Sequence, residues 1–299
     1  MIYIPRLLLI GYSSHNKYSG VFMRNVQRAL TSLGLEYDVM SPEACEGADL
    51  AGYDLFLGVG DELFRRRPEL VAKLHETGGK VVDFRTKYLP HKLKVRLAHF
   101  LQKPSMRADY VLTHMQDRCS RCFYVGQGVN DDLLYPEHDD YFTIFVDHWM
   151  PRRRECVQEI LDQCRQLYES REKVRVWYQS AHGIVENDFT ATPGDYRTYP
   201  FEELATFYRK THLFLPTHRE TQGVVAAEIG MCGGLTLLQP WMYPKERRLE
   251  LPHRLYRGKI AWPGSVDIEA NRAMARKHFG LDAFAARLQD AFNRIGPLG

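Results

Sequence analysis

The stretch Thr211–Cys232, THLFLPTHRETQGVVAAEIGMC, carries the pattern that decides the fold. It opens with a short β-type apolar run that a proline closes, so a strand is expected to end at Pro216. After Gly223 the residues continue as a helix-compatible apolar run. The stretch therefore predicts a strand, an acidic loop and a helix in direct succession.

Two glutamates lie on either side of the expected helix start. Glu220 falls in the loop ahead of the helix and Glu228 in its early turns. Unbonded backbone N–H groups at a helix start form a site for phosphate, and a carboxylate beyond them can accept hydrogen bonds from hydroxyl groups. The pattern indicates a phosphate-bearing, hydroxyl-rich ligand, such as a nucleotide sugar. The plainer alternative is a core helix with two solvated glutamates.

The same alternation of strand and helix extends through the chain in both directions. Apolar runs separated by helix-compatible segments predict a parallel sheet covered on both faces. Strands are expected near residues 6–12, 37–40, 53–59, 80–84, 109–113, 122–125, 142–148, 174–180, 212–216 and 235–238. Helices are expected near residues 21–33, 70–76, 154–170, 202–210 and 268–295, the last with a break at Gly280.

An acidic, irregular stretch that ends at Asp140 has the character of an interdomain linker. We therefore expect an acceptor-side domain over residues 1–137, a donor domain over 138–271, and C-terminal helices over 272–299 that return to the first domain. Two doubly wound domains that face each other would form a cleft at the carboxyl ends of their strands. The glycine loops at Gly20 and Gly223 would open onto it, as would the loop that carries Arg152 and Arg153.

Composition limits the class of protein. Hydrophobic content of 44% and charged content of 26% are typical of a soluble globular protein. No run approaches the ~18 apolar residues of a spanning helix, and Arg6 interrupts the N-terminal run, which reads as a strand and not as a signal peptide. Six cysteines in a chain of this length indicate no disulfide framework, so a reducing cytoplasm is the expected compartment.

One cysteine pair has the spacing of a metal site. Cys119 and Cys122 lie near His114, but no second close pair supplies the fourth ligand that zinc needs. Buried or surface thiols are therefore the default interpretation. There is no Asp-x-Asp motif either, so neither a metal nor another cofactor is expected.

Basic residues concentrate between Lys80 and Arg121, where ten of them stand against three acids, although the chain's net charge is only +3. A candidate helix there repeats basic residues along one stripe: Lys92, Arg96, His99 and Lys103. The stripe is either a solvated face or a surface for a polyanion, which would be an anionic membrane or nucleic acid. His15 and Lys17 are further candidates to contact an acceptor or a phosphate.

The motif Glu220, seven residues, Glu228, with Gly223 between them, resembles the signature of a large family of retaining glycosyltransferases of GT-B fold, glycosyltransferase family 4. Tyr199–Leu204 resembles the segment that precedes the family's motif, and Gly128–Asn130 the stretch that closes its first domain. The chain departs from the pattern where Thr221 and Gln222 replace Gly-Phe and Leu235 replaces a proline.

The resemblance implies two facing Rossmann-like domains and transfer of a sugar from a nucleotide-diphosphate sugar with retention and without metal. It assigns the sugar hydroxyls to Glu220, the ribose to Glu228, and the phosphates to the backbone of Gln222 and Gly223. Gly20 would let the backbone approach the donor.

Independently of the resemblance, negative charge develops on a departing diphosphate, and positively charged side chains are needed to stabilise it. Arg152 and Arg153 are the candidates, because a guanidinium binds phosphate through two hydrogen bonds. The expected acceptor lies on or near a polyanion, as a lipid-linked or envelope glycan at a membrane surface would, with the enzyme peripheral to the membrane. The alternative acceptor is a modified base of DNA or of another nucleic acid. A non-catalytic sugar-nucleotide binding module is the other alternative.

Overall fold

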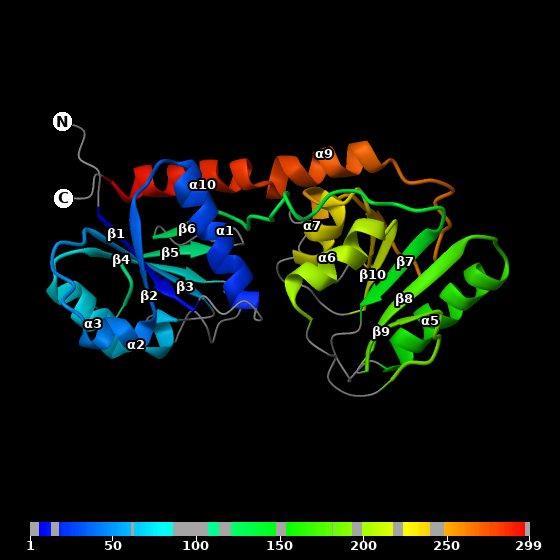
Figure 1. Cartoon of the computed structure of the whole chain (residues 1–299), viewed down its shortest axis with the longest axis horizontal. Coiled ribbons are helices and arrows are strands. Elements are labelled where there is room, and N and C mark those ends of the chain that lie inside the picture. The colour runs from blue at the N-terminus through cyan, green and yellow to red at the C-terminus, as the bar shows by residue number, and fades with distance from the viewer. Residues whose placement is uncertain are drawn as a thin grey trace. The chain divides into compact units, whose positions relative to one another are not determined.

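The structure is a computed structural model, in which the chain folds into two compact α/β units (Figure 1). The first unit comprises Met1–Gly128 with Leu281–Gly299, and the second comprises Val129–Gly280. The residues that the structure describes are 6–12, 18–60, 63–85, 107–113, 121–147, 154–180, 182–192, 199–217, 224–239 and 248–296.

These boundaries differ from those expected at 137 and 271. The segment after Gly128 is bonded into the second unit, because the Val129 amide donates to the Phe279 carbonyl at 2.8 Å. Arg209 Nε also donates to the Leu133 carbonyl at 2.8 Å. The expected linker is therefore held within the second unit by hydrogen bonds to its main chain, which include one from the Glu137 amide to the Arg209 carbonyl at 2.9 Å.

The first unit is built on a six-stranded sheet. Its strands are β1 (Leu7–Gly11), β2 (Tyr37–Met40), β3 (Leu55–Gly60), β4 (Lys80–Arg85), β5 (Tyr110–Thr113) and β6 (Cys122–Tyr124). They are all parallel, in the order β2-β1-β3-β4-β5-β6. Alternate residues of β1 belong to two different hydrophobic cores. Leu7 and Leu9 pack on one face of the sheet, and Leu8 and Ile10 pack on the other.

Helices cover both faces of this sheet (Figure 1). They are α1 (Tyr18–Ser32), α2 (Pro42–Gly47), α3 (Pro68–Glu76), α10 (Leu281–Ile295) and the 3-10 turn η1 (Phe64–Arg66). On one face Phe22 of α1 and Phe284 of α10 pack against Phe84 of β4, at ring-centroid distances of 4.7 and 6.0 Å. The C-terminal helix is thus part of the first core.

The second unit has the same design. Its strands are β7 (Phe142–Asp147), β8 (Val174–Ser180), β9 (Gly183–Glu186), β10 (Leu213–Pro216), β11 (Leu235–Leu238) and β12 (His253–Leu255). Their order is β12-β11-β10-β7-β8-β9, and only β9 is antiparallel to its neighbour. Strand β7 is central and buried on both faces, with Ile144 and Val146 on one side and Phe145 on the other.

The helices of the second unit are α5 (Arg154–Glu169), α6 (Phe201–Lys210), α7 (Val224–Met231) and α9 (Ile268–Phe279). Helix α7 ends in a Schellman motif, in which the Gly234 amide bonds to the Ile229 carbonyl at 2.9 Å and Gly233 takes a positive φ of 85°. Gly233 also lies against Ile268 of α9, because a Cβ there would stand 2.4 Å from Ile268 Cγ2.

Four elements were not expected from the sequence: α2, η1, β9 and β12. Each is short, and six, four or three residues carry too little periodicity to predict an element. Helix α1 also begins at Tyr18 and not near Val21, so Gly20 lies in its first helical turn and not in an open loop. None of the described helices combines the length and the apolar character that crossing a membrane requires.

Candidate functional site

Buried polar side chains gather at the carboxyl edge of the second sheet. The register sets Asp147 at the end of β7 between Gln179 of β8 and Pro216 of β10. Asp147, Gln179 and Thr217 are only 4%, 5% and 4% exposed. The Thr217 hydroxyl donates a short hydrogen bond to the Asp147 backbone carbonyl. Because burial of polar groups is costly and ligands of such sheets bind at this edge, these residues form the candidate site.

Glu228 lies in the second turn of α7, which follows β10. It is 7% exposed and is the one charged residue in a helix whose other members are all apolar or glycine. Its carboxylate lies near Cys232, where burial first and then the charge of Glu228 raise the pKa of the thiol. A carboxylate retained in so apolar a helix is a strong candidate for ligand binding.

Most of the other predicted site residues lie outside the described part of the chain. These are Glu220, Gln222, Gly223, Arg152, Arg153, His15, Lys17, Lys92, Arg96, His99 and Lys103. Their predicted roles remain predictions. His114 and Cys119 also lie outside it, while Cys122 is half-buried on β6. Among the described residues, no group of three His, Cys, Asp or Glu side chains comes together to hold a metal ion.

Sequence reasoning did not select Asp147 or Thr217. Asp147 is the last residue of an apolar strand and Thr217 directly follows another, so a polar residue at a strand end is the signal that points to them. What the sequence does not contain is the register that places the two side by side.

The carboxyl edge of the first sheet holds a buried ion pair. Arg85 Nε donates to Asp83 Oδ2 at 2.5 Å, and their side chains are 3% and 0% exposed. Both residues were counted in the basic window between Lys80 and Arg121. Because they are buried and neutralise each other inside the sheet, neither contributes to a surface that a polyanion could reach.

A second polar group surrounds Tyr12, which follows β1 at the same edge. The Tyr12 hydroxyl donates to Glu43 Oε1 at 2.6 Å and accepts from Arg67 Nη2 at 2.9 Å. The hydrogen bond to Glu43 raises the pKa of Tyr12 and lowers the pKa of Glu43. Tyr12 and Arg67 line a cavity of about 780 Å³ together with Glu46, Leu63, Arg66, Glu69, Leu70 and Lys73.

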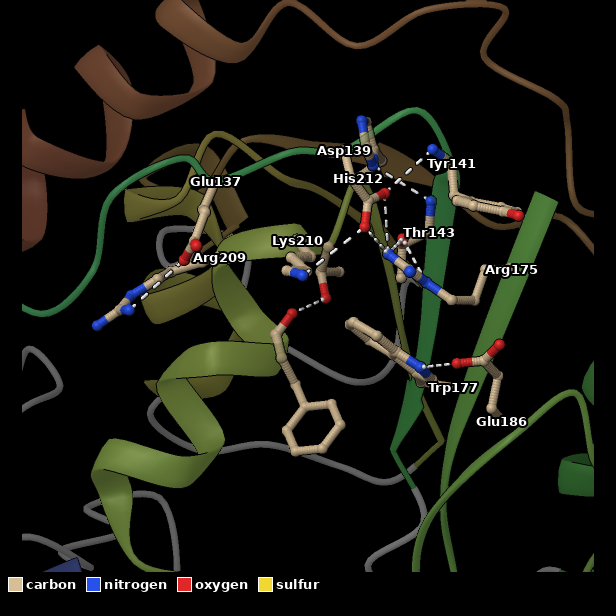
Figure 2. Close-up of polar contacts among 12 residues, drawn as sticks. Glu137, Asp139, Tyr141, Thr143, Arg175, Trp177, Glu186, Arg209, Lys210 and His212 are labelled. Atoms are coloured by element: carbon tan, nitrogen blue, oxygen red, sulfur yellow. Dashed lines mark hydrogen bonds and ion pairs between the residues drawn. The ribbon is translucent and has the colours of Figure 1, made fainter. Parts of the chain in front are cut away.

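The opposite, amino edge of the second sheet is closed by its own contacts (Figure 2). Arg175 donates to Asp139 at 2.9 Å and to Thr143 Oγ1 at 2.7 Å, and its guanidinium lies 4.3 Å from the Trp177 ring centroid. The Thr143 amide donates to Nδ1 of His212 at 3.2 Å. These groups satisfy one another, so this edge has a structural role and the carboxyl edge is the candidate site.

The chain resembles solved structures in fold, although no family model and no curated protein matches its sequence. Sucrose-phosphate synthase from Thermosynechococcus elongatus aligns with a TM-score of 0.64 at 12% identity, over 97% of this chain and 99% of that one. A putative UDP-N-acetylglucosamine 2-epimerase from Listeria monocytogenes aligns at 0.57 and 16% identity, over 96% and 95%. HepE from Anabaena, in complex with UDP and glucose, aligns at 0.57 and 10% identity, over 97% and 99%.

These similarities extend over nearly the whole of each chain. At sequence identities of 10–16% they show similarity of fold alone. They confirm the expected fold class, which is GT-B, built from two six-stranded α/β sheets dominated by parallel pairing.

Proposed function

We propose that this protein is a glycosyltransferase that uses a nucleotide-diphosphate sugar, with the donor bound at the carboxyl edge of the second sheet. The observation that carries the proposal is the set of buried polar side chains at that edge, Asp147, Gln179 and Thr217, with Glu228 on the helix that follows β10. HepE, which shares the fold, was solved with UDP and glucose, and that supports a nucleotide-sugar ligand here.

The proposed roles follow the motif. Glu228 binds the ribose hydroxyls, Glu220 binds hydroxyls of the transferred sugar, and backbone N–H groups of Gln222 and Gly223 bind the diphosphate. Helix α7 begins directly after this loop, and the first N–H groups of a helix, which have no acceptor within the helix, favour an anion at such a place. Gly20, at the start of α1, is proposed to let the backbone approach the donor.

The proposed reaction is retaining and needs no metal. The acceptor oxygen bonds to the anomeric carbon as the bond to the nucleotide diphosphate breaks, and the leaving phosphate takes the acceptor proton. Arg152 and Arg153 are proposed to hold the charge that develops on that phosphate. The acceptor is proposed to be a hydroxyl of a lipid-linked or envelope glycan at a membrane surface.

The experiment is a panel of nucleotide sugars incubated with the full-length protein, followed by detection of released nucleotide diphosphate. Release from at least one donor, lost in Glu220→Ala and retained in a control with an exposed carboxylate removed, Glu172→Ala, is the expected result. Donor binding without release would indicate a non-catalytic module. Conversion of the donor to an epimer would indicate an epimerase, the activity named for the Listeria structure. Either outcome would refute the proposal.

The nucleic-acid alternative has its own control. The sugar of the active donor is labelled, and its transfer is measured to glycans and to DNA that carries hydroxylated bases. Transfer to the DNA and not to glycans would show that the acceptor is a nucleic-acid base. Transfer to glycans alone supports the acceptor proposed here.

A further inference from the structure

We propose that the cavity beside Tyr12 in the first unit binds an uncharged saccharide, with the Tyr12 ring as its platform. The binding site is inferred from the first unit alone, and only the ligand's role as acceptor rests on the proposed function. Figure 1 shows the elements that surround it: β1, α2 and α3.

The cavity has the size and the place of a ligand site. Its volume of about 780 Å³ falls within the ~300–1,000 Å³ typical of ligand pockets. Tyr12 follows the end of β1, and α3 begins after β3, so the cavity lies toward the carboxyl edge of a parallel sheet. Ligands of doubly wound sheets bind at this edge.

Tyr12 is held in place before any ligand binds. The residue is 41% exposed, yet its hydroxyl is bonded to both Glu43 and Arg67. Two hydrogen bonds fix the ring while leaving its surface accessible. An aromatic ring offers an apolar surface on which the C–H face of a sugar can pack, and a ring fixed in advance loses little entropy on binding.

The charges around the cavity are already matched. Arg67 pairs with Glu43 and with Glu46, the latter at 2.9 Å. The Lys73 ammonium donates to three main-chain carbonyls at the end of α2, those of Cys45, Glu46 and Ala48, at 2.9, 2.8 and 3.0 Å. These contacts tie α2 to α3. The three basic residues that line the cavity, Arg66, Arg67 and Lys73, are matched in number by three acids, namely Glu46 and Glu69 of the lining and Glu43, which pairs with Arg67.

This balance selects the class of ligand. A polyanion gains little where acids and bases are equal in number, and it would meet the carboxylates of Glu46 and Glu69, whose like charge opposes its binding. An uncharged saccharide can donate its hydroxyl hydrogens to those carboxylates and accept from Arg67. Leu63 and Leu70, 7% and 3% exposed, add an apolar lining suited to C–H groups. The cavity therefore fits a neutral, hydroxylated ligand better than a nucleic acid.

The test is saturation-transfer NMR of the full-length protein with neutral glucose, galactose, mannose and N-acetylglucosamine oligosaccharides, and with a heparin fragment and a DNA oligonucleotide as anionic probes. We expect binding of at least one neutral saccharide, weakened about tenfold or more in Tyr12→Ala. Tyr12→Phe keeps the ring and should bind more tightly than Tyr12→Ala. The matched control is Tyr168→Ala, which removes a tyrosine of similar exposure, 39%, from the second unit and should bind like the wild type.

Three results would overturn the inference: no binding of any neutral saccharide, binding that survives Tyr12→Ala in a variant with an unchanged melting temperature, or binding of anionic probes alone. Titration of the wild type with a panel of nucleoside diphosphates that includes UDP separates this failure from that of the proposed function. Binding of a nucleoside diphosphate without saccharide binding refutes the cavity's role only, whereas saccharide binding without binding of any nucleoside diphosphate refutes the donor assignment only.

Discussion

Thr217 donates its hydroxyl hydrogen to the backbone carbonyl of Asp147, and this bond ties the end of β10 to the end of β7. The two residues are 70 positions apart in the chain. The bond is buried and lies at the edge where the donor is proposed to bind. It therefore connects the stability of the second unit with the geometry of the candidate site.

Replacement of Thr217 tests that connection. Thr217→Val keeps the shape but leaves the Asp147 carbonyl without the hydroxyl, and we expect the second unit to lose about 1–2 kcal/mol of unfolding free energy. Thr217→Ser should lose less, because it keeps the donor. Urea unfolding followed by tryptophan fluorescence is a suitable measurement, since the tryptophans among the described residues, Trp177 and Trp262, both lie in the second unit. Equal stability of the two variants would contradict the role of the bond.

Glu228 is expected to set the affinity for the nucleotide. Glu228→Gln keeps the size of the side chain and removes its charge, so UDP binding measured by calorimetry should weaken about tenfold or more, as expected when a hydrogen bond to a charged group is lost. Glu172→Gln, at an exposed position, is the matched control and should bind as the wild type does. Unchanged UDP affinity in Glu228→Gln would exclude Glu228 from the donor site.

Gly233 is expected to be irreplaceable for two separate reasons. Its φ is +85°, and an added Cβ would lie 2.4 Å from Ile268 Cγ2. Gly258 has a similar φ of +81° but nothing within 4 Å of its Cβ position. Gly258→Ala should therefore cost about 1 kcal/mol from backbone strain alone, and Gly233→Ala about 1–3 kcal/mol more from overpacking. If chemical denaturation shows that both variants lose the same free energy of unfolding, then contact with Ile268 of α9 does not exclude a side chain at position 233.

The pair of His138 and His212 is expected to make the second unit sensitive to acid. Their ring centroids are 4.0 Å apart (Figure 2 shows His212). Burial, followed by the neighbouring His138 and Arg175, lowers the pKa of His212 from 6.5 to about 4, although Asp139 and the Lys210 backbone oppose the shift. Burial also lowers the pKa of His138.

Between pH 6.5 and about 4 the unfolded chain binds a proton at His212 that the folded chain does not. The free energy of unfolding is therefore unaffected by His212 above pH 6.5. As the pH falls below 6.5, it decreases by about 1.4 kcal/mol per pH unit because of this residue. His212→Asn keeps an acceptor for the Thr143 amide and removes the titrating ring. Its unfolding free energy should depend less on pH across this window, and an unchanged slope in urea titrations would refute the assignment.

Much of the fold was predictable because its signal is local. The run LLLIG of β1, the β-type run that ends at Pro216 and the apolar helix after Gly223 each specify their element through composition and spacing. The six-residue α2 and the three-residue β12 were not predictable, since elements so short gain their stability from neighbours and not from their own pattern. Glu228 was selected from its motif, and the structure adds that it is buried, while its role in binding stays a prediction.

The sequence by itself determined the order of strands and helices and the presence of two α/β halves, because apolar periodicity within a segment decides whether it forms a strand or a helix. Only the tertiary structure decided which polar ends meet. Strand β10 lies beside β7, although β8 and β9 intervene in the chain, and that pairing brings Thr217 to Asp147. In the first unit the tertiary structure likewise brings Arg67 to Tyr12, although the two residues are 55 positions apart in the chain. The physical reason is that strand order and register depend on how both faces of a sheet are covered, which no single segment encodes.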